Sequence, residues 1–231
     1  MTVIVRDMQG GGGGHGKTRF VDSLLSPDQP FAFGNNWMAM LNLSNPPLGT
    51  AYVGSDVASA VDRTASGTTY RNPTAGGFLP VVFAVPIPID WSFCRNRNQY
   101  SQFRIDTNPA GVNRVCVFTF LDPNGTNLYV LQLVTEQGRF AVSRINNATT
   151  VDLIAPSVTT AYSNGDLLRL EADTTTTPGT TTLRAFKNGV LIATTGDNSG
   201  SRQTSGLFGW GGVGANPAVN AIVRDYEGGS L

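Results

Sequence analysis

Hydrophobic and polar positions alternate with a period of two over most of the chain after residue 100, and this alternation is the pattern of β-strands. We predict strands at 115–121, 127–134, 139–145, 167–172, 181–187, 190–195, 207–212 and 221–227. In one of these strands Leu168, Leu170 and Ala172 fall on the same face. We expect that face to lie in the core.

Two turn sequences join neighbouring predicted strands into hairpins. Residues 122–125 read Asp-Pro-Asn-Gly, which has the chemistry of a hairpin turn. Asn188 and Gly189 alone separate two other strands, and this pair is the strongest short-range signal for a hairpin. A type I′ turn at this position places Phe186 opposite Leu191.

The first hundred residues are less regular. Residues 18–25 (TRFVDSLL) have the composition of a helix of two turns that ends before Pro27. Segment 80–91 is apolar but contains three prolines, which cannot donate hydrogen bonds within a sheet. We therefore expect this segment to be an edge strand or an extended stretch lying on the sheets.

Many short strands, frequent turns and almost no helix predict an all-β chain, a two-sheet antiparallel β-sandwich or jelly roll. No linker divides the chain, so we expect a flexible N-terminal arm at 1–17 and a single domain at 18–231. VIVRDMQGG (3–11) matches AIVRDYEGG (221–229) at six positions. Either the match is chance, or the arm forms a strand at an equivalent sheet edge of its own or a neighbouring subunit.

Composition excludes several classes of function. Charged residues make up 14% of the chain and the net charge is zero. No basic run marks a nucleic-acid or lipid surface, and no apolar run approaches the roughly 18 residues that suggest a membrane span. The start lacks the pattern of a signal peptide, which predicts synthesis in a cytoplasm. We expect Cys94 and Cys116 to be thiols there, with Cys116 buried.

Residues Gly11–Thr18 match the phosphate-binding string G-x-x-x-x-G-K-T at every position. A phosphate loop, however, needs a parallel sheet and a long following helix. Asp122, the candidate partner at the end of a strand, instead begins a hairpin turn. Five consecutive glycines at 10–14 give the backbone maximal freedom, the opposite of a preorganised loop. We interpret the segment as a glycine arm and expect no nucleotide cofactor.

Catalytic chemistry has few candidates. His15 is the one histidine of the chain, and it lies within the glycine run, where it cannot be held as a base. Glu136, Glu171 and Glu227 each stand alone on a different predicted strand or turn. No spacing of aspartates favours a carboxylate pair, although a pair across strands stays open. We predict that the protein is not an enzyme.

The tryptophans offer a choice between core and ligand. Trp37, Trp91 and Trp210 either fill the core or stack on sugar rings. Trp210 lies in a glycine-rich strand and is expected to be the least buried of the three, so it is the candidate for sugar stacking.

Several motifs, in this order, resemble the concanavalin A-like lectin/glucanase superfamily, including laminin-G-like jelly rolls. The residues that carry the resemblance are Arg19–Asp22, Phe33–Trp37, Gly165–Glu171, Lys187–Leu191, Ser205–Trp210 and Ile222–Glu227. The resemblance spans about residues 18–229. It implies a jelly roll that binds sugars or proteins, and a structural Ca²⁺ held by Asp225, with Asp22 as a second ligand. The E-x-D-x-x-E strand of the glucanase branch is missing, which argues against hydrolysis.

A jelly roll with a glycine-rich arm and low charge is also similar to bacteriophage virion proteins. Our first hypothesis is a non-enzymatic virion structural protein, a capsid decoration, cement or head-fibre subunit. Such a subunit is expected to form a homo-oligomer, plausibly a trimer, and to contact other virion proteins such as the major capsid protein. The alternative is a carbohydrate-binding module of a tail fibre, adhesin or bacterial lectin. The third hypothesis is a divergent glycan hydrolase.

Overall fold

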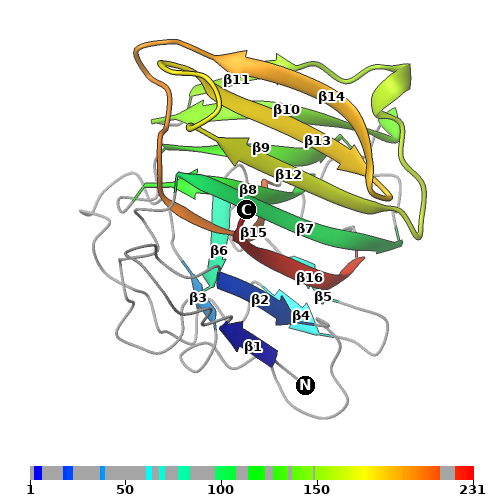
Figure 1. Ribbon diagram of the computed structural model, residues 1–231. Coiled ribbons are helices and arrows are strands. Elements are labelled where there is room, and N and C mark those ends of the chain that lie inside the picture. The colour runs from blue at the N-terminus through cyan, green and yellow to red at the C-terminus, as the bar shows by residue number, and fades with distance from the viewer. Residues whose placement is uncertain are drawn as a thin grey trace.

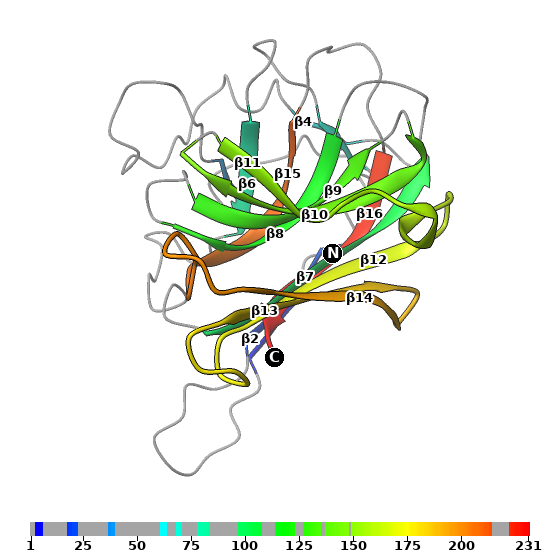
Figure 2. The ribbon, with the colours of Figure 1, turned by 90° about the horizontal axis from the view of Figure 1, so that it is seen from above.

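The computed structural model describes residues 3–6, 18–22, 37–39, 61–63, 68–70, 78–83, 97–107, 114–122, 127–134, 137–147, 149–213 and 222–231. Its strands form two antiparallel sheets that pack against each other (Figures 1 and 2). The predicted all-β, two-sheet jelly roll is therefore confirmed. No helix in this described part of the chain is both long and apolar enough to cross a membrane.

The first sheet has the order β1-β2-β16-β7-β12-β13-β14, and a small β4–β5 pair joins it at β16. Its strands are β1 (Val3–Arg6), β2 (Thr18–Asp22), β4 (Val61–Arg63), β5 (Thr68–Tyr70), β7 (Asn98–Thr107), β12 (Leu167–Asp173), β13 (Thr181–Lys187), β14 (Val190–Asp197) and β16 (Ile222–Ser230). Strands far apart in sequence, such as β7 and β16, are thus direct neighbours.

The second sheet has the order β11-β10-β9-β8-β15-β6-β3. Its strands are β3 (Trp37–Ala39), β6 (Phe78–Phe83), β8 (Arg114–Leu121), β9 (Asn127–Val134), β10 (Arg139–Asn146), β11 (Thr149–Ile154) and β15 (Leu207–Val213). A short 3-10 helix, η3 (Val158–Thr160), follows β11.

Both predicted hairpins are confirmed. Strands β8 and β9 pair in antiparallel register, with Cys116 opposite Gln132. In the β13–β14 hairpin Asn188 has φ 53° and Gly189 has φ 80°, the two positive angles of a type I′ turn. Phe186 lies opposite Leu191, as the turn requires.

The predicted helix at 18–25 is wrong, because Thr18–Asp22 forms β2. A two-turn helix has little stability of its own, whereas Phe20 and Val21 are good strand formers that pair with β1 on one side and with β16 on the other. Residues 23–25 lie outside the described residues. Thr18 therefore opens a strand where a phosphate loop would need a helix.

The edge position expected for segment 80–91 is also wrong where the structure describes it. Strand β6 lies between β15 and β3. Pro80 is tolerated because the pairing with β3 covers Val81–Phe83 and stops short of it. The missing N–H of Pro80 therefore costs no bond to β3.

The echo between the two chain ends has a structural counterpart. Strands β1 and β16 flank β2 on its two sides, and both run antiparallel to it. The two strands align differently with β2. Val21 of β2 pairs with Val3 of β1 on one side and with Glu227 of β16 on the other. The described part of the predicted arm is thus an edge strand of its own sheet.

The core fills the space between the two sheets. Leu168, Leu170 and Ala172 are fully buried, which confirms the predicted inner face of β12. Strands β8 and β9 are buried on both faces over Val115–Leu121 and Leu128–Val134. Their nearly continuous apolar sequences suit a strand that has no solvent-exposed side.

Buried polar side chains on β7 join the two sheets. Gln99 accepts a hydrogen bond from the backbone N–H of Phe120 at 3.2 Å and donates one to the carbonyl of Gly206. Phe120 has φ 54° and sits in a bulge of β8 against β15. Ser101 donates to the carbonyl of Gly209 at 2.7 Å. Because these groups are buried, losing a partner would leave an unsatisfied polar atom.

The close approach at Gly206 yields a first prediction. A Cβ atom there would lie less than 3.0 Å from backbone atoms of Phe120 and Leu121. We expect Gly206→Ala to lower the free energy of unfolding by about 1–3 kcal/mol, measured by urea denaturation. Gly200→Ala is the matched control, because nothing lies within 4 Å of its added methyl group. Equal stability of the two variants would contradict the close packing.

Candidate functional site

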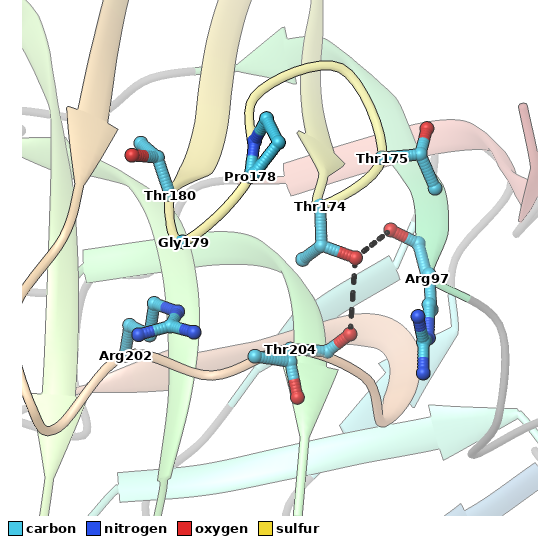
Figure 3. A pocket seen from close by; sticks show the side chains of 8 residues that line it. All are labelled: Arg97, Thr174, Thr175, Pro178, Gly179, Thr180, Arg202 and Thr204. Atoms are coloured by element: carbon cyan, nitrogen blue, oxygen red, sulfur yellow. Dashed lines mark hydrogen bonds between the residues drawn. The ribbon is translucent and has the colours of Figure 1, made fainter.

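A polar pocket opens at the end of the sandwich where β12 ends and β15 begins. The connection from β14 to β15, which forms part of it, lies at the left in Figure 1. Three segments build it: Arg97 directly before β7, the β12–β13 loop (174–180) and the β14–β15 connection (198–206). Its volume is about 520 Å³. It is lined by Arg97, Thr174, Thr175, Pro178, Gly179, Thr180, Arg202 and Thr204 (Figure 3).

Thr174 ties the three segments together. Its N–H donates to the carbonyl of Arg97 at 3.0 Å, and its hydroxyl lies 3.1 Å from the same carbonyl. The hydroxyl also lies 3.5 Å from the carbonyl of Thr204 (Figure 3). The pocket walls are therefore held by main-chain bonds, which leave the side chains of Arg97 and Thr204 available to a ligand.

Asp173 shapes the loop that forms one wall. It is 6% exposed and accepts hydrogen bonds from the N–H and hydroxyl groups of Thr175 and Thr176. Burial by itself raises the pKa of this carboxyl, but these hydrogen bonds outweigh it and lower the pKa to about 2. Asp173 is thus a charged anchor beneath the threonine loop.

Asp197 anchors the opposite wall in the same way. Tyr129 donates to Asp197 at 2.7 Å, and the Arg144 guanidinium lies 2.9 Å from it. The N–H of Ser199 donates to it at 3.0 Å. Burial opposes ionisation of Asp197, yet the hydrogen bonds prevail and its pKa is lowered. The same burial, with the neighbouring carboxylate, raises the pKa of Tyr129.

Apart from Pro178 and Gly179, the lining consists of arginines and threonines. Arg97 and Arg202 lie on opposite sides of the pocket, with Thr174 and Thr204 between them (Figure 3). Guanidinium groups donate hydrogen bonds, and threonine hydroxyls both donate and accept them. No carboxylate belongs to the described lining. The arrangement can bind a polar ligand rich in oxygen atoms.

None of the predictions made from the sequence concerns this pocket. Its residues come from three segments that are distant in sequence, so no spacing connects them. One signal was present, the run Asp-Thr-Thr-Thr-Thr-Pro-Gly-Thr at 173–180. Such a hydroxyl-rich loop between two strands marks a polar surface at a sheet end.

The prediction of sugar stacking by Trp210 is wrong. The Trp210 side chain is 0% exposed and belongs to the core between the sheets. The side chain of Trp210 points from β15 into the core, and the glycines beside it do not expose the ring to solvent. A buried ring cannot meet a sugar. The side chain of Trp37 and all of Trp91 lie outside the described residues.

The predicted calcium ligands lie on neighbouring strands. Asp22 on β2 faces Tyr226 on β16, the residue after Asp225. Asp225 has φ 52° and its carboxylate is paired with the Arg104 guanidinium at 3.2 Å. Among the described residues no three His, Cys, Asp or Glu side chains gather as a metal site. The side chain of Asp22 lies outside the described residues, so calcium binding by Asp225 and Asp22 stays a prediction.

Two glutamates that looked isolated in the sequence flank one tyrosine. Glu171 on β12 lies opposite Tyr100 on β7, and the Tyr100 hydroxyl donates to Glu227 at 2.6 Å. Arg169 stacks 3.9 Å from the centre of the Tyr100 ring and pairs with Glu171 at 2.7 Å. Both carboxylates are thus held by partners in a structural network. Glu136 and His15 lie outside the described residues.

Cys116 is a buried free thiol, as predicted, and burial raises its pKa. A thiol in this state is poorly reactive, because the thiolate is the nucleophile. Cys94 lies outside the described residues.

Comparison with solved structures confirms the fold. The carbohydrate binding module CBM66 from Bacillus subtilis has a TM-score of 0.51 at 14% identity, covering 84% of this chain and 95% of that one. An endo-1,3-beta-glucanase from Streptomyces sioyaensis has 0.52 at 14%, covering 96% and 99%. A protein of unknown function from Shewanella oneidensis has 0.53 at 8%, covering 92% and 85%.

These likenesses establish a concanavalin A-like jelly roll and no more, because the identities are low. No family model matches the chain, and no curated protein matches it. The protein is thus a two-sheet jelly roll with a polar pocket at one end.

The anchoring by Asp173 gives a pH-dependent prediction. A pKa lowered from 3.8 to about 2 corresponds to about 2 kcal/mol of stability. This contribution is present above the unfolded value of 3.8 and is lost as the pH falls toward 2. We expect Asp173→Asn to be destabilised by about 2 kcal/mol at neutral pH, with the difference from wild type vanishing between pH 4 and 2.

Urea denaturation at a series of pH values measures this difference. Asn198→Ser, at an exposed position, is the control and should change stability by less than about 0.5 kcal/mol at every pH. A loss at Asp173 that stays constant down to pH 2 would show that its charge does not anchor the loop.

Proposed function

We propose that this protein is a non-enzymatic carbohydrate-binding protein whose ligand lies in the pocket between Arg97 and Arg202. The observation that carries the proposal is the lining, where threonine hydroxyls and guanidinium groups converge on one cavity of about 520 Å³. Pockets that hold small ligands commonly measure about 300–1,000 Å³. Sugars present many hydroxyls, which such donors and acceptors match.

The fold supports the same proposal. The similar structures include a carbohydrate binding module and a glucanase, and the likeness covers nearly the full length of both. In a sandwich, loops at one end are built on rigid strands and suit recognition. Here the loop 174–180 and the connection 198–206 are fixed by Asp173 and Asp197, so the pocket is held in place without a ligand.

Binding without hydrolysis is supported by the chemistry of the lining. Glycosidases generally use two carboxyl groups beside the scissile bond. The described lining residues carry none. Asp173 lies behind the threonine loop, where its oxygens already accept hydrogen bonds from Thr175 and Thr176. A sugar in the pocket would therefore meet donors but no acid or base.

Blocking the pocket tests this function. We expect Thr204→Trp to fill the pocket and abolish binding on a glycan array that wild-type protein labels. Thr150→Trp is the matched control, since Thr150 is exposed on β11 and does not line the pocket. Undiminished binding by Thr204→Trp would remove the pocket from the proposal. Release of reducing sugar by the wild type would contradict the non-enzymatic part.

We further propose that the protein works on a virus particle, as a self-associating subunit that contacts other virion proteins such as the major capsid protein. The observation that favours this role is β1. Among the strands that the structure describes it pairs only with β2, at a sheet edge, and a glycine-rich sequence at 10–14 separates the two strands. An edge strand of this kind can be exchanged between neighbouring subunits. Many copies would then add avidity to a weak glycan site.

Removal of residues 1–17 tests the role of β1. We expect full-length protein to be an oligomer by light scattering, and the truncated protein to have a smaller mass. Circular dichroism should show the same β signal in both, because the core lies between the other strands. An unchanged oligomeric mass would count against exchange of β1.

A further inference from the structure

The two arginines of the pocket differ from most others in the described part of the chain. Five arginines there have a carboxylate partner within 2.7–3.8 Å: Arg104, Arg144, Arg169, Arg184 and Arg224. Arg97 and Arg202 have none among the described residues. Both line the same cavity. The pocket therefore presents two positive charges that the described residues leave without a counter-charge.

Asp173, the carboxylate that directly precedes the pocket loop 174–180, does not neutralise the two arginines. Asp173 precedes the threonine loop, but it is buried and its oxygens accept hydrogen bonds from Thr175 and Thr176. Its charge is further compensated by the Arg184 guanidinium at 3.6 Å. The negative charge of Asp173 is thus used to hold the loop, and Arg97 and Arg202 remain free to face a ligand.

We propose that the ligand is an acidic oligosaccharide, whose carboxylate groups pair with Arg97 and Arg202 while its hydroxyls bond to the threonines. This inference rests on the carbohydrate-binding function proposed above. A guanidinium matches a carboxylate through two parallel hydrogen bonds. Thr174 and Thr204 lie between the two arginines, where ring hydroxyls of the same sugar would fall (Figure 3).

The size of the pocket and the residues that line it favour a sugar acid over a small inorganic anion. Pro178 and Gly179 add apolar surface and backbone to the lining, and the cavity is far larger than one phosphate needs. Four threonines line the pocket, against two arginines. A carboxylated sugar uses both kinds of group, whereas a free anion uses only the arginines.

The test compares each acidic sugar with its neutral ester. Trigalacturonate, a hyaluronan tetrasaccharide and sialyllactose are titrated into the full-length protein by calorimetry, each as the free acid and as the methyl ester. We expect at least one acid to bind about tenfold or more tightly than its ester, because each charge-assisted hydrogen bond is lost on esterification. The preference should weaken as salt is added. Inorganic phosphate is titrated in parallel.

Arginine variants connect this preference to the pocket. Arg97→Gln and Arg202→Gln should each lower affinity for the acid about tenfold and leave ester binding nearly unchanged. Arg139→Gln is the control. It removes the same charge from β10, outside the pocket, and should bind like wild type.

The outcomes separate this inference from the function on which it rests. Equal binding of every acid and its ester, at a site blocked by Thr204→Trp, overturns the acidic specificity while carbohydrate binding stands. Phosphate binding as tight as that of the acids, lost in both arginine variants and without any sugar preference, overturns both. Binding of neither acids nor esters also overturns the acidic ligand, and neutral sugars on the array then decide the broader function.

Discussion

The buried side chain of Gln99 is the contact on which the rest of the structure depends. It starts on β7 in one sheet and bonds to Phe120 in the other sheet and to Gly206, the residue directly before β15 of that sheet. The two sheets of a sandwich are held together mainly by apolar packing. Such packing sets the distance between the sheets but does not prevent one sheet from sliding over the other. A directional hydrogen bond between the sheets also fixes their relative position. Here that bond sits at the end of the molecule where the pocket opens.

The pocket inherits its geometry from this link. Arg97 lies two residues before Gln99, and Thr204 lies two residues before Gly206, so one buried amide positions both walls. Thr174 then closes the third side by bonding to the carbonyls of Arg97 and Thr204. The carboxylates of Asp173 and Asp197 accept hydrogen bonds from the backbone of the two loops and hold these loops in place. Arg97 and Arg202, which have no carboxylate partner among the described residues, are the charges that we propose to take part in recognition.

Local features were predictable from the sequence and non-local ones were not. The Asn188–Gly189 hairpin and the inner face at Leu168 depend on neighbouring residues, and both are confirmed. The helix expected from Thr18 failed because pairing with strands from both ends of the chain overrides local preference. Trp210 was misplaced because its neighbours suggested an open strand. The pocket joins three segments that only the sheet order brings together.

The most direct test of the central claim is a crystal structure of the protein with a bound acidic oligosaccharide. The account predicts the sugar between Arg97 and Arg202, with its carboxylate on a guanidinium and its hydroxyls on Thr174 or Thr204. A sugar bound instead on the outer face of the first sheet, over Tyr100 and Arg169, would contradict it. In that case the charged network around Glu171 and Glu227 would be the recognition surface.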